Sequence, residues 1–205
     1  MKKTYCGIAA LILAVALTVC SIGDYFTDCS EVRSGVLRLH ITANSDSDAD
    51  QTVKLMVRDA LLKSGNEIFD GSVTAADAEE KLSPHLADIE KTACGVLKAN
   101  GFDYGARAYI VNEYFDVREY DGVTLPAGNY TALRVALGSG EGKNWWCVMF
   151  PPLCLPAACE DDDAFAVFGG EGANVVKAQS GYKIKFKIVE AAERFMERLR
   201  SHSDK

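Results

Sequence analysis

The sequence predicts an α+β domain: a mainly antiparallel sheet with helices packed on one face, preceded by an N-terminal hydrophobic signal or anchor segment. Three observations support this class. Residues 36–43 alternate apolar and polar side chains, which is typical of a half-buried strand. Two stretches with helical spacing follow, and each begins with a capping motif. Beyond residue 105, β-branched and aromatic runs alternate with turn signals, which indicates short-linked strands.

The composition is that of a folded, acidic protein. Charged residues make up 25% and hydrophobic residues 48% of the 205 residues, which argues against global disorder. A domain of this length buries enough surface to fold without a metal or a disulfide. We expect no cofactor and no metal site. The net charge is −7 and no Lys/Arg cluster is visible, so we exclude nucleic acid as the main partner.

The N-terminus predicts export. Lys2 and Lys3 precede an uncharged apolar run over residues 6–22. A short positive region before an apolar stretch is typical of a signal peptide, and this run is also close to the length that spans a bilayer. Cleavage and membrane association through this run both stay open. We therefore divide the chain into a signal peptide or anchor (1–23), a polar tether (24–35), one α+β domain (36–200) and a tail (201–205).

The first helix is predicted by the spacing of Ser47 and Asp50, which is that of a capping box. We expect this helix to end near Gly65, because glycine is common just after a helix. Its buried face is a stripe of apolar residues at helical spacing: Val53, Met56, Val57, Ala60 and Leu61.

The second helix begins with the same kind of signal. Thr74 and Asp77 form another capping box, and Gly101 follows the last residue of the helical pattern. Pro84 lies inside this pattern, and it either kinks the helix or restarts it with Ser83 as the cap.

The strands come next. Residues 106–115, 132–137 and 145–150 have strand composition, and the glycine-rich loop over residues 138–144 most simply joins the last two as an antiparallel hairpin. Residues 183–188 alternate lysine with apolar side chains, which favours a strand, and a helical pattern follows up to Leu199.

Two apparent ligand motifs have simpler interpretations. Asp46, Asp48 and Asp50 resemble the start of a calcium loop, but Gln51 and Val57 occupy the positions that need glycine and glutamate. Helix capping accounts for the acidic residues without a metal. The glycine-rich loop ends in Lys143, yet neither of the phosphate-loop spacings is present, so a flexible connection is favoured.

The sequence leaves the redox state of two cysteines open. Cys147 and Cys154 could form a disulfide around Pro151-Pro152, or they could be reduced and buried. A nucleophilic pair of one of these cysteines with His40 or His85 is the enzymatic alternative. The serine-hydrolase elbow, the zinc-protease helix and the cysteine-protease signatures are all missing, which argues against nucleophilic catalysis.

Adjacent tryptophans mark a second feature of the last strand. Trp145 and Trp146 must face opposite sides of the sheet, so one can join the core while the other needs a covering helix, partner or lipid. His40 lies near Arg38 on the polar side of the first strand, where we expect a hydrogen-bonded surface or interface residue.

Three stretches together resemble the stage II sporulation protein R family of endospore-forming bacteria. They are residues 37–47 leading into 57–60, residues 126–135, and residues 142–154 with the string Asn-Trp-Trp-Cys-Val-Met-Phe-Pro-Pro-Leu-Cys. The resemblance implies an exported signal made in the forespore, acting in the space between forespore and mother cell. Its partner would be a membrane-embedded aspartic protease of the mother-cell side, the sporulation sigma factor processing peptidase, which processes the sigma-E precursor.

The resemblance implies that the chain is not an enzyme, and the family offers no catalytic residues to transfer. We expect the partner-binding surface to include His40, Asn44, Arg58, Trp145 and Trp146. Two other classes of function stay open: a Cys-dependent envelope hydrolase and a passive envelope-binding module.

Overall fold

The structure is a computed structural model that describes residues 26–120 and 123–151. The predicted signal segment over residues 1–23, the predicted strand and helix over residues 183–199, and the tail lie outside these residues. Within the described part of the chain, no helix is both long and apolar enough to cross a membrane.

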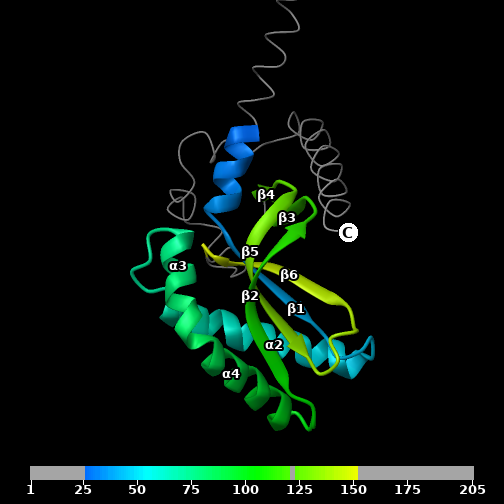
Figure 1. The fold of residues 1–205 in the computed structure, drawn as a ribbon. Coiled ribbons are helices and arrows are strands. Elements are labelled where there is room, and N and C mark those ends of the chain that lie inside the picture. The colour runs from blue at the N-terminus through cyan, green and yellow to red at the C-terminus, as the bar shows by residue number, and fades with distance from the viewer. Residues whose placement is uncertain (1–25, 121–122, 152–205) are drawn as a thin grey trace, which may run out of the picture.

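Six strands and three α-helices with named bounds make up the described domain, and a short 3₁₀ helix separates the last two helices (Figure 1). In chain order they are β1 (Leu37–Thr42), α2 (Asp48–Ile68), α3 (Ala75–Leu82), the 3₁₀ helix (Ser83–His85), α4 (Leu86–Ala99), β2 (Ala106–Phe115), β3 (Arg118–Tyr120), β4 (Val123–Leu125), β5 (Gly128–Leu137) and β6 (Asn144–Phe150).

The main sheet has the strand order β2-β5-β1-β6. Strand β1 is parallel to β5, whereas the pairs β2–β5 and β1–β6 are antiparallel. Strands β3 and β4 form a separate antiparallel ribbon. The predicted α+β class with a mainly antiparallel sheet is confirmed. The predicted hairpin across residues 138–144 is wrong, because β1 lies between β5 and β6.

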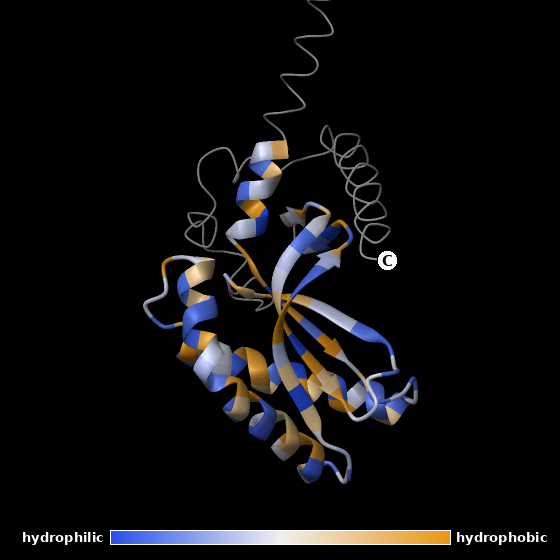
Figure 2. Cartoon of the chain, in the orientation of Figure 1, coloured by the Kyte–Doolittle hydropathy of each residue, from blue (hydrophilic) through white to orange (hydrophobic). Residues whose placement is uncertain are grey.

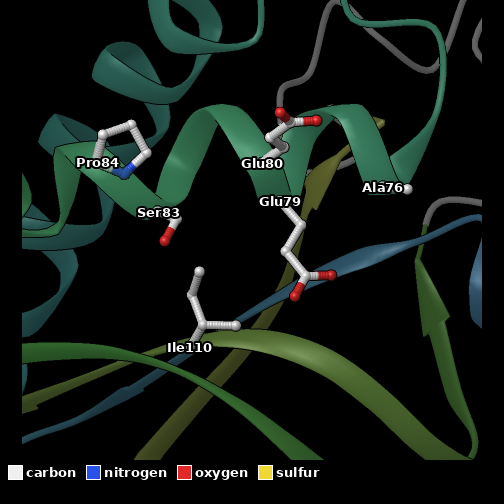
Figure 3. Close-up of a pocket in the computed structure, with 6 residues that line it drawn as sticks. All are labelled: Ala76, Glu79, Glu80, Ser83, Pro84 and Ile110. Atoms are coloured by element: carbon white, nitrogen blue, oxygen red, sulfur yellow. The ribbon is translucent and has the colours of Figure 1, made fainter.

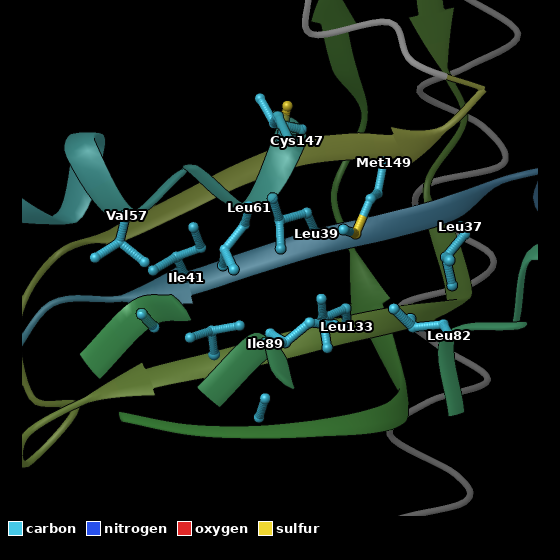
Figure 4. Close-up of a cluster of buried hydrophobic side chains, with 14 of the residues drawn as sticks. Leu37, Leu39, Ile41, Val57, Leu61, Leu82, Ile89, Leu133, Cys147 and Met149 are labelled. Atoms are coloured by element: carbon cyan, nitrogen blue, oxygen red, sulfur yellow. The ribbon is translucent and has the colours of Figure 1, made fainter. Parts of the chain in front are cut away.

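Helices α2, α3 and α4 cover one face of the sheet, as predicted (Figure 1). Both long helices mix hydrophobic and hydrophilic residues along their length, as amphipathic helices do (Figure 2). Their apolar sides meet the strands in the main core, in which every labelled side chain of Figure 4 is buried. Its members include Leu37, Leu39, Ile41, Val57, Leu61, Leu82, Ile89, Leu133, Cys147 and Met149.

The other face of the sheet carries a second, smaller core, which the sequence did not predict. A helix over residues 26–34 and the β3–β4 ribbon lie on this side (Figure 1). Cys29 and Val32 of that helix are buried, and Arg33 Nη1 donates to Ala127 O at 3.2 Å. The polar tether predicted for residues 24–35 is therefore corrected for residues 26–34, and β1 is buried on both faces rather than on one.

The first long helix starts as predicted but continues further. Ser47 is the N-cap, and its side chain accepts from Asp50 N. The helix passes through Gly65 and ends at Ile68. A Cβ atom on Gly65 would lie 2.9 Å from Met149 Cε, so this glycine permits a close approach of α2 to β6. The predicted end at Gly65 is wrong because a packing glycine and a terminal glycine look alike in the sequence.

The second helical stretch is divided in two. Thr74 and Asp77 form the predicted reciprocal capping box of α3. Pro84 lies in the 3₁₀ helix, which separates α3 from α4, so the restart is confirmed. Ser83 is the C-cap of α3 rather than the cap of α4, whose N-cap His85 makes no side-chain capping bond.

Candidate functional site

The five predicted partner-binding residues gather at one end of the sheet, which we call the tryptophan end and define by His40, Asn44, Arg58, Trp145 and Trp146. The β1–β6 register places His40 opposite Trp146 and Ile41 opposite Trp145. Asn44 follows β1, and Arg58 reaches the same end from α2. The sheet pairing therefore brings together side chains that are about a hundred residues apart in the sequence.

Trp146 lies on the face of the smaller core, where His40 stacks on it. The two rings are 3.6 Å apart with an interplanar angle of 22°. Trp146 also meets Phe115 edge to face at 4.8 Å, and Arg118 lies 6.0 Å from its ring centroid. Trp146 is half-buried. One side of the indole is thus fixed by stacking while part of it still reaches solvent.

His40 is buried, with 3% of its surface exposed, and both ring nitrogens have polar neighbours. Nδ1 donates to Glu113 Oε1 at 2.7 Å, and Nε2 lies 2.9 Å from the side-chain amide oxygen of Asn144. An amide group can turn to present its NH₂ or its oxygen, so Asn144 can serve either protonation state of the imidazole. The predicted hydrogen bonding of His40 is confirmed, but its predicted place at the surface is wrong.

Glu113 joins the histidine to a third strand. Its Oε2 accepts from Arg134 Nη1 at 3.3 Å, so one carboxylate bridges β1 and β5 from β2. The sequence analysis missed Glu113 and Arg134. The available signal was that both charged side chains face the same side of neighbouring strands, but it becomes visible only once the strand order is known.

Trp145 lies on the opposite face, as the alternation predicts. Its ring packs against the main core, and the Arg58 guanidinium lies 4.5 Å from the ring centroid. Arg58 also pairs with Asp59 at 2.6 Å. A cation over an indole face is favourable, and it leaves the outer edge of Arg58 available to solvent.

Asn44 belongs to a polar cluster beyond the end of β1. Its Oδ1 accepts from Ser139 N at 3.0 Å, and its Nδ2 donates to Asp50 Oδ2 at 3.1 Å. A Cβ atom on Gly142 would lie 2.3 Å from Ser45 O, so the glycine-rich loop packs closely on the loop after β1. The loop is therefore held in place, in contrast to the flexible connection that we expected.

Asp50 is the acidic centre of this cluster and is 5% exposed. It accepts from Ser45 Oγ at 2.5 Å, and the Tyr104 hydroxyl also donates to it. Burial acts to raise the pKa of Asp50, but the hydrogen bonds from Ser45, Tyr104 and Asn44 outweigh burial and hold that pKa below its usual value. Burial and the bond to Asp50 in turn raise the pKa of Tyr104.

Two acidic residues of the apparent calcium motif, Asp46 and Asp50, accept hydrogen bonds from protein donors instead. Asp46 Oδ1 accepts from Lys143 N at 2.7 Å, and Lys54 Nζ donates to Lys143 O at 3.0 Å. Burial lowers the pKa of Lys54, while Asp46 acts in the other direction. Among the described residues no group of three or more His, Cys, Asp or Glu side chains could hold a metal.

Arg38 is a buried cation that the sequence analysis treated only as part of a polar strand face. It is 0% exposed, its Nε donates to Cys147 O at 3.1 Å, and its Nη2 donates to the Tyr120 hydroxyl at 2.6 Å. The guanidinium lies between aromatic rings, 4.2 Å from the centroid of Phe115 and 4.9 Å from that of Tyr130.

The charge of Arg38 is not balanced by an acid in the described part of the chain, and its Nη1 has no hydrogen-bond partner there. Burial lowers the pKa of Arg38, although neighbouring Tyr120 and Tyr130 oppose this effect. An arginine side chain nevertheless stays protonated, and among the described residues the two hydrogen bonds and the aromatic faces compensate for its burial.

Cys147 is disulfide-bonded, and its partner lies outside the described residues. The predicted pairing with Cys154 stays a prediction, whereas the reduced alternative is wrong for Cys147. Its side chain belongs to the main core, on the face opposite to that of His40. A disulfide sulfur is not a thiolate, so Cys147 is not a nucleophile activated by His40.

Residues 33–160 match the family model of stage II sporulation protein R. The chain belongs to this family. Within the family, stage II sporulation protein R of Bacillus subtilis (strain 168) is 36% identical over 119 residues, which cover 58% of this chain and 53% of that protein. The match thus spans about half the length of that relative. No solved structure matches the chain.

Membership confirms the resemblance carried by the three sequence stretches, and it makes the chain a stage II sporulation protein. The matched range contains the whole tryptophan end. The relative is named as a sporulation protein and not as an enzyme.

Proposed function

We propose that this chain is an exported sporulation signal that activates a membrane-embedded aspartic protease of the mother-cell side, which then processes the sigma-E precursor. Residues 1–23 direct the chain out of the forespore, into the space between forespore and mother cell. The domain then acts by contact and carries out no chemistry of its own.

The observation that carries this proposal is the half-buried tryptophan pair at the tryptophan end. Trp145 and Trp146 leave β6 on opposite faces, each contacts a neighbouring cation or imidazole, and both residues are half-buried. Tryptophan and arginine are the residue types that contribute most to protein–protein binding. A prearranged pair loses little side-chain freedom on binding.

An activator of this kind works through differential affinity. The protease must have an active and an inactive state, and the tryptophan end must bind the active state more tightly. Affinity for both states alike would not shift the equilibrium, so binding and activation are separable measurements.

The decisive experiment is reconstitution in a non-sporulating host. The chain is co-expressed with the protease and a sigma-E precursor, and precursor shortening is followed on gels. Shortening that depends on the chain is expected. Its absence at adequate levels of all three proteins would contradict the proposal.

Variants of the tryptophan end locate the contact. We expect Trp146→Ala and Arg58→Ala to reduce precursor shortening several-fold while the purified chains stay folded by circular dichroism. Tyr109→Ala is the matched control, because Tyr109 is an aromatic residue of β2 that is 41% exposed and lies outside the tryptophan end. Equal activity of all three variants would exclude this surface.

The two other classes of function predict different results. A hydrolase dependent on Cys154 would lose turnover in Cys154→Ser with its fold intact, whereas loss of a disulfide lowers stability. A passive envelope-binding module held by residues 6–22 would lose its effect when the chain is exported from Asp24 onward with a foreign signal peptide. An activator would keep its effect in that form.

A further inference from the structure

A groove separates α3 from the edge strand β2, far along the sheet order from the tryptophan end. Its volume is about 750 Å³. In Figure 3 the Glu79 side chain extends from α3 towards the strands, and Ile110 points from β2 towards the helix. The lining residues are Ala76, Glu79, Glu80, Ser83, Pro84 and Ile110.

Along the first half of β2, side chains of α4 protect the outer backbone edge. Ala106 N donates to Cys94 Sγ at 3.3 Å, and Ala108 N donates to Glu90 Oε1 at 2.8 Å. Both N–H groups therefore point away from β5, and side chains of α4 satisfy them. An edge that is satisfied in this way cannot accept another strand.

The protection stops at Ile110. Because N–H groups alternate between the two edges of a strand, those of Ile110 and Asn112 also point away from β5. The described part of the chain offers these two groups no acceptor. The open part of the edge thus begins where the groove begins, at Ile110.

The groove is acidic beside an apolar floor. Glu79 and Glu80 form no ion pair within the described residues, and Ile110 and Pro84 supply apolar surface next to them. A lysine or arginine side chain fits this combination, since its methylene stem can cover apolar surface while its charged end reaches a carboxylate.

We propose that the β2 edge at Ile110 and Asn112 binds an extended, basic segment of a partner protein as an added strand. Main-chain hydrogen bonds to the two N–H groups give the pairing, and alternate basic side chains enter the groove towards Glu79 and Glu80. None of the residues that line the groove belongs to the tryptophan end, so the proposed strand pairing and the proposed contact with the protease can be tested separately.

Fluorescence anisotropy with the full chain in detergent tests the proposal. The probe is a labelled peptide of alternating lysine and valine, which should bind in a salt-dependent manner. Two control peptides should not bind: one with glutamate in place of lysine, and one with N-methylated peptide bonds that cannot pair.

Two pairs of variants separate the backbone and charge contributions. Asn112→Pro removes one outward N–H without disturbing the bonds to β5, and proline is tolerated on a strand edge. We expect roughly fivefold weaker binding of the lysine peptide, whereas Asn112→Ala, which keeps the N–H, should bind normally. Glu79→Lys should weaken binding by about tenfold, whereas Glu67→Lys, in α2 and outside the groove, should not.

Three results would overturn the proposal. The first is equal binding of the lysine and glutamate peptides. The second is unchanged binding by both Asn112→Pro and Glu79→Lys. The third is a several-fold gain in peptide affinity when Lys183, Lys185 and Lys187 are all replaced by serine, because the basic segment of this chain would then be the occupant.

Discussion

The two faces of β1 are equally buried but differ in how burial is made favourable. Leu37, Leu39 and Ile41 face the helices and meet only apolar side chains of the main core. Arg38 and His40 face the smaller core, where each polar atom needs a partner in a particular direction. Hydrophobic contact is non-directional, whereas a buried polar group without a partner costs free energy.

The difference teaches that the two faces have separate tasks. The apolar face holds the helices on the sheet, and it would do so with many combinations of side chains of similar volume. The polar face fixes a few groups in defined positions beside Trp146. We therefore expect stability to depend mainly on the first face, and the position of Trp146 to depend mainly on the second.

The largest loss of stability should come from a substitution on the apolar face of β1. Leu39→Ala removes a fully buried side chain from the middle of the main core, and such truncations cost about 2–5 kcal/mol. Urea unfolding followed by circular dichroism measures the loss. Val73→Ala is the control, because Val73 is 74% exposed and should change stability by less than about 0.5 kcal/mol. A similarly small loss for Leu39→Ala would remove the distinction between the faces.

A smaller loss of stability should come from replacing Asp50, the buried acid beyond the end of β1 whose carboxylate accepts several hydrogen bonds. Asp50→Asn weakens the bonds from Ser45 and Tyr104, and we expect a loss of about 1–3 kcal/mol at neutral pH. Asp48→Asn, an exposed acid in the same helical turn, should change stability much less.

The same variant has a defined pH dependence. Because the folded-state pKa of Asp50 is held below its usual value, its contribution is complete above that value and is lost as the pH falls through the folded-state pKa. The stability difference between Asp50→Asn and the parent chain should therefore shrink below about pH 4. A difference that is constant from neutral to acidic pH would show that the carboxylate charge contributes nothing.

The smallest change in stability should come from replacing Arg38, the buried cation of the polar face, by methionine. Arg38→Met replaces a charge that no acid of the described residues balances by an apolar side chain of similar length, and we expect the unfolding free energy to change by less than about 1 kcal/mol. Arg38→Ala also empties the space between the rings and should cost about 2 kcal/mol or more. A large loss for Arg38→Met in urea unfolding would mean that the charge itself holds the polar face together.

Local signals in the sequence were sufficient to predict where the two capped helices begin. Ser47 and Thr74 cap the helices that they were predicted to cap, since capping depends on residues within one turn. The opposite facing of Trp145 and Trp146 was likewise predictable, because it follows from strand alternation alone.

The strand order of the sheet could not be predicted from such local signals. The loop over residues 138–144 looks like a hairpin locally, yet β1 occupies the place between β5 and β6. For the same reason the neighbours of His40 could not be predicted. Glu113 and Asn144 reach it only through the pairing of β2, β5, β1 and β6, which depends on the packing of the whole sheet.

The central place of β1 also governs when the domain can become a folded unit. As the chain is synthesised, β1 appears first, but its two neighbours are β5 and β6, the last strands of the described domain. Contacts between such distant parts of a chain form late and slowly. A partly made chain therefore has no closed sheet, and the sheet can close only once the segment up to Phe150 has been synthesised.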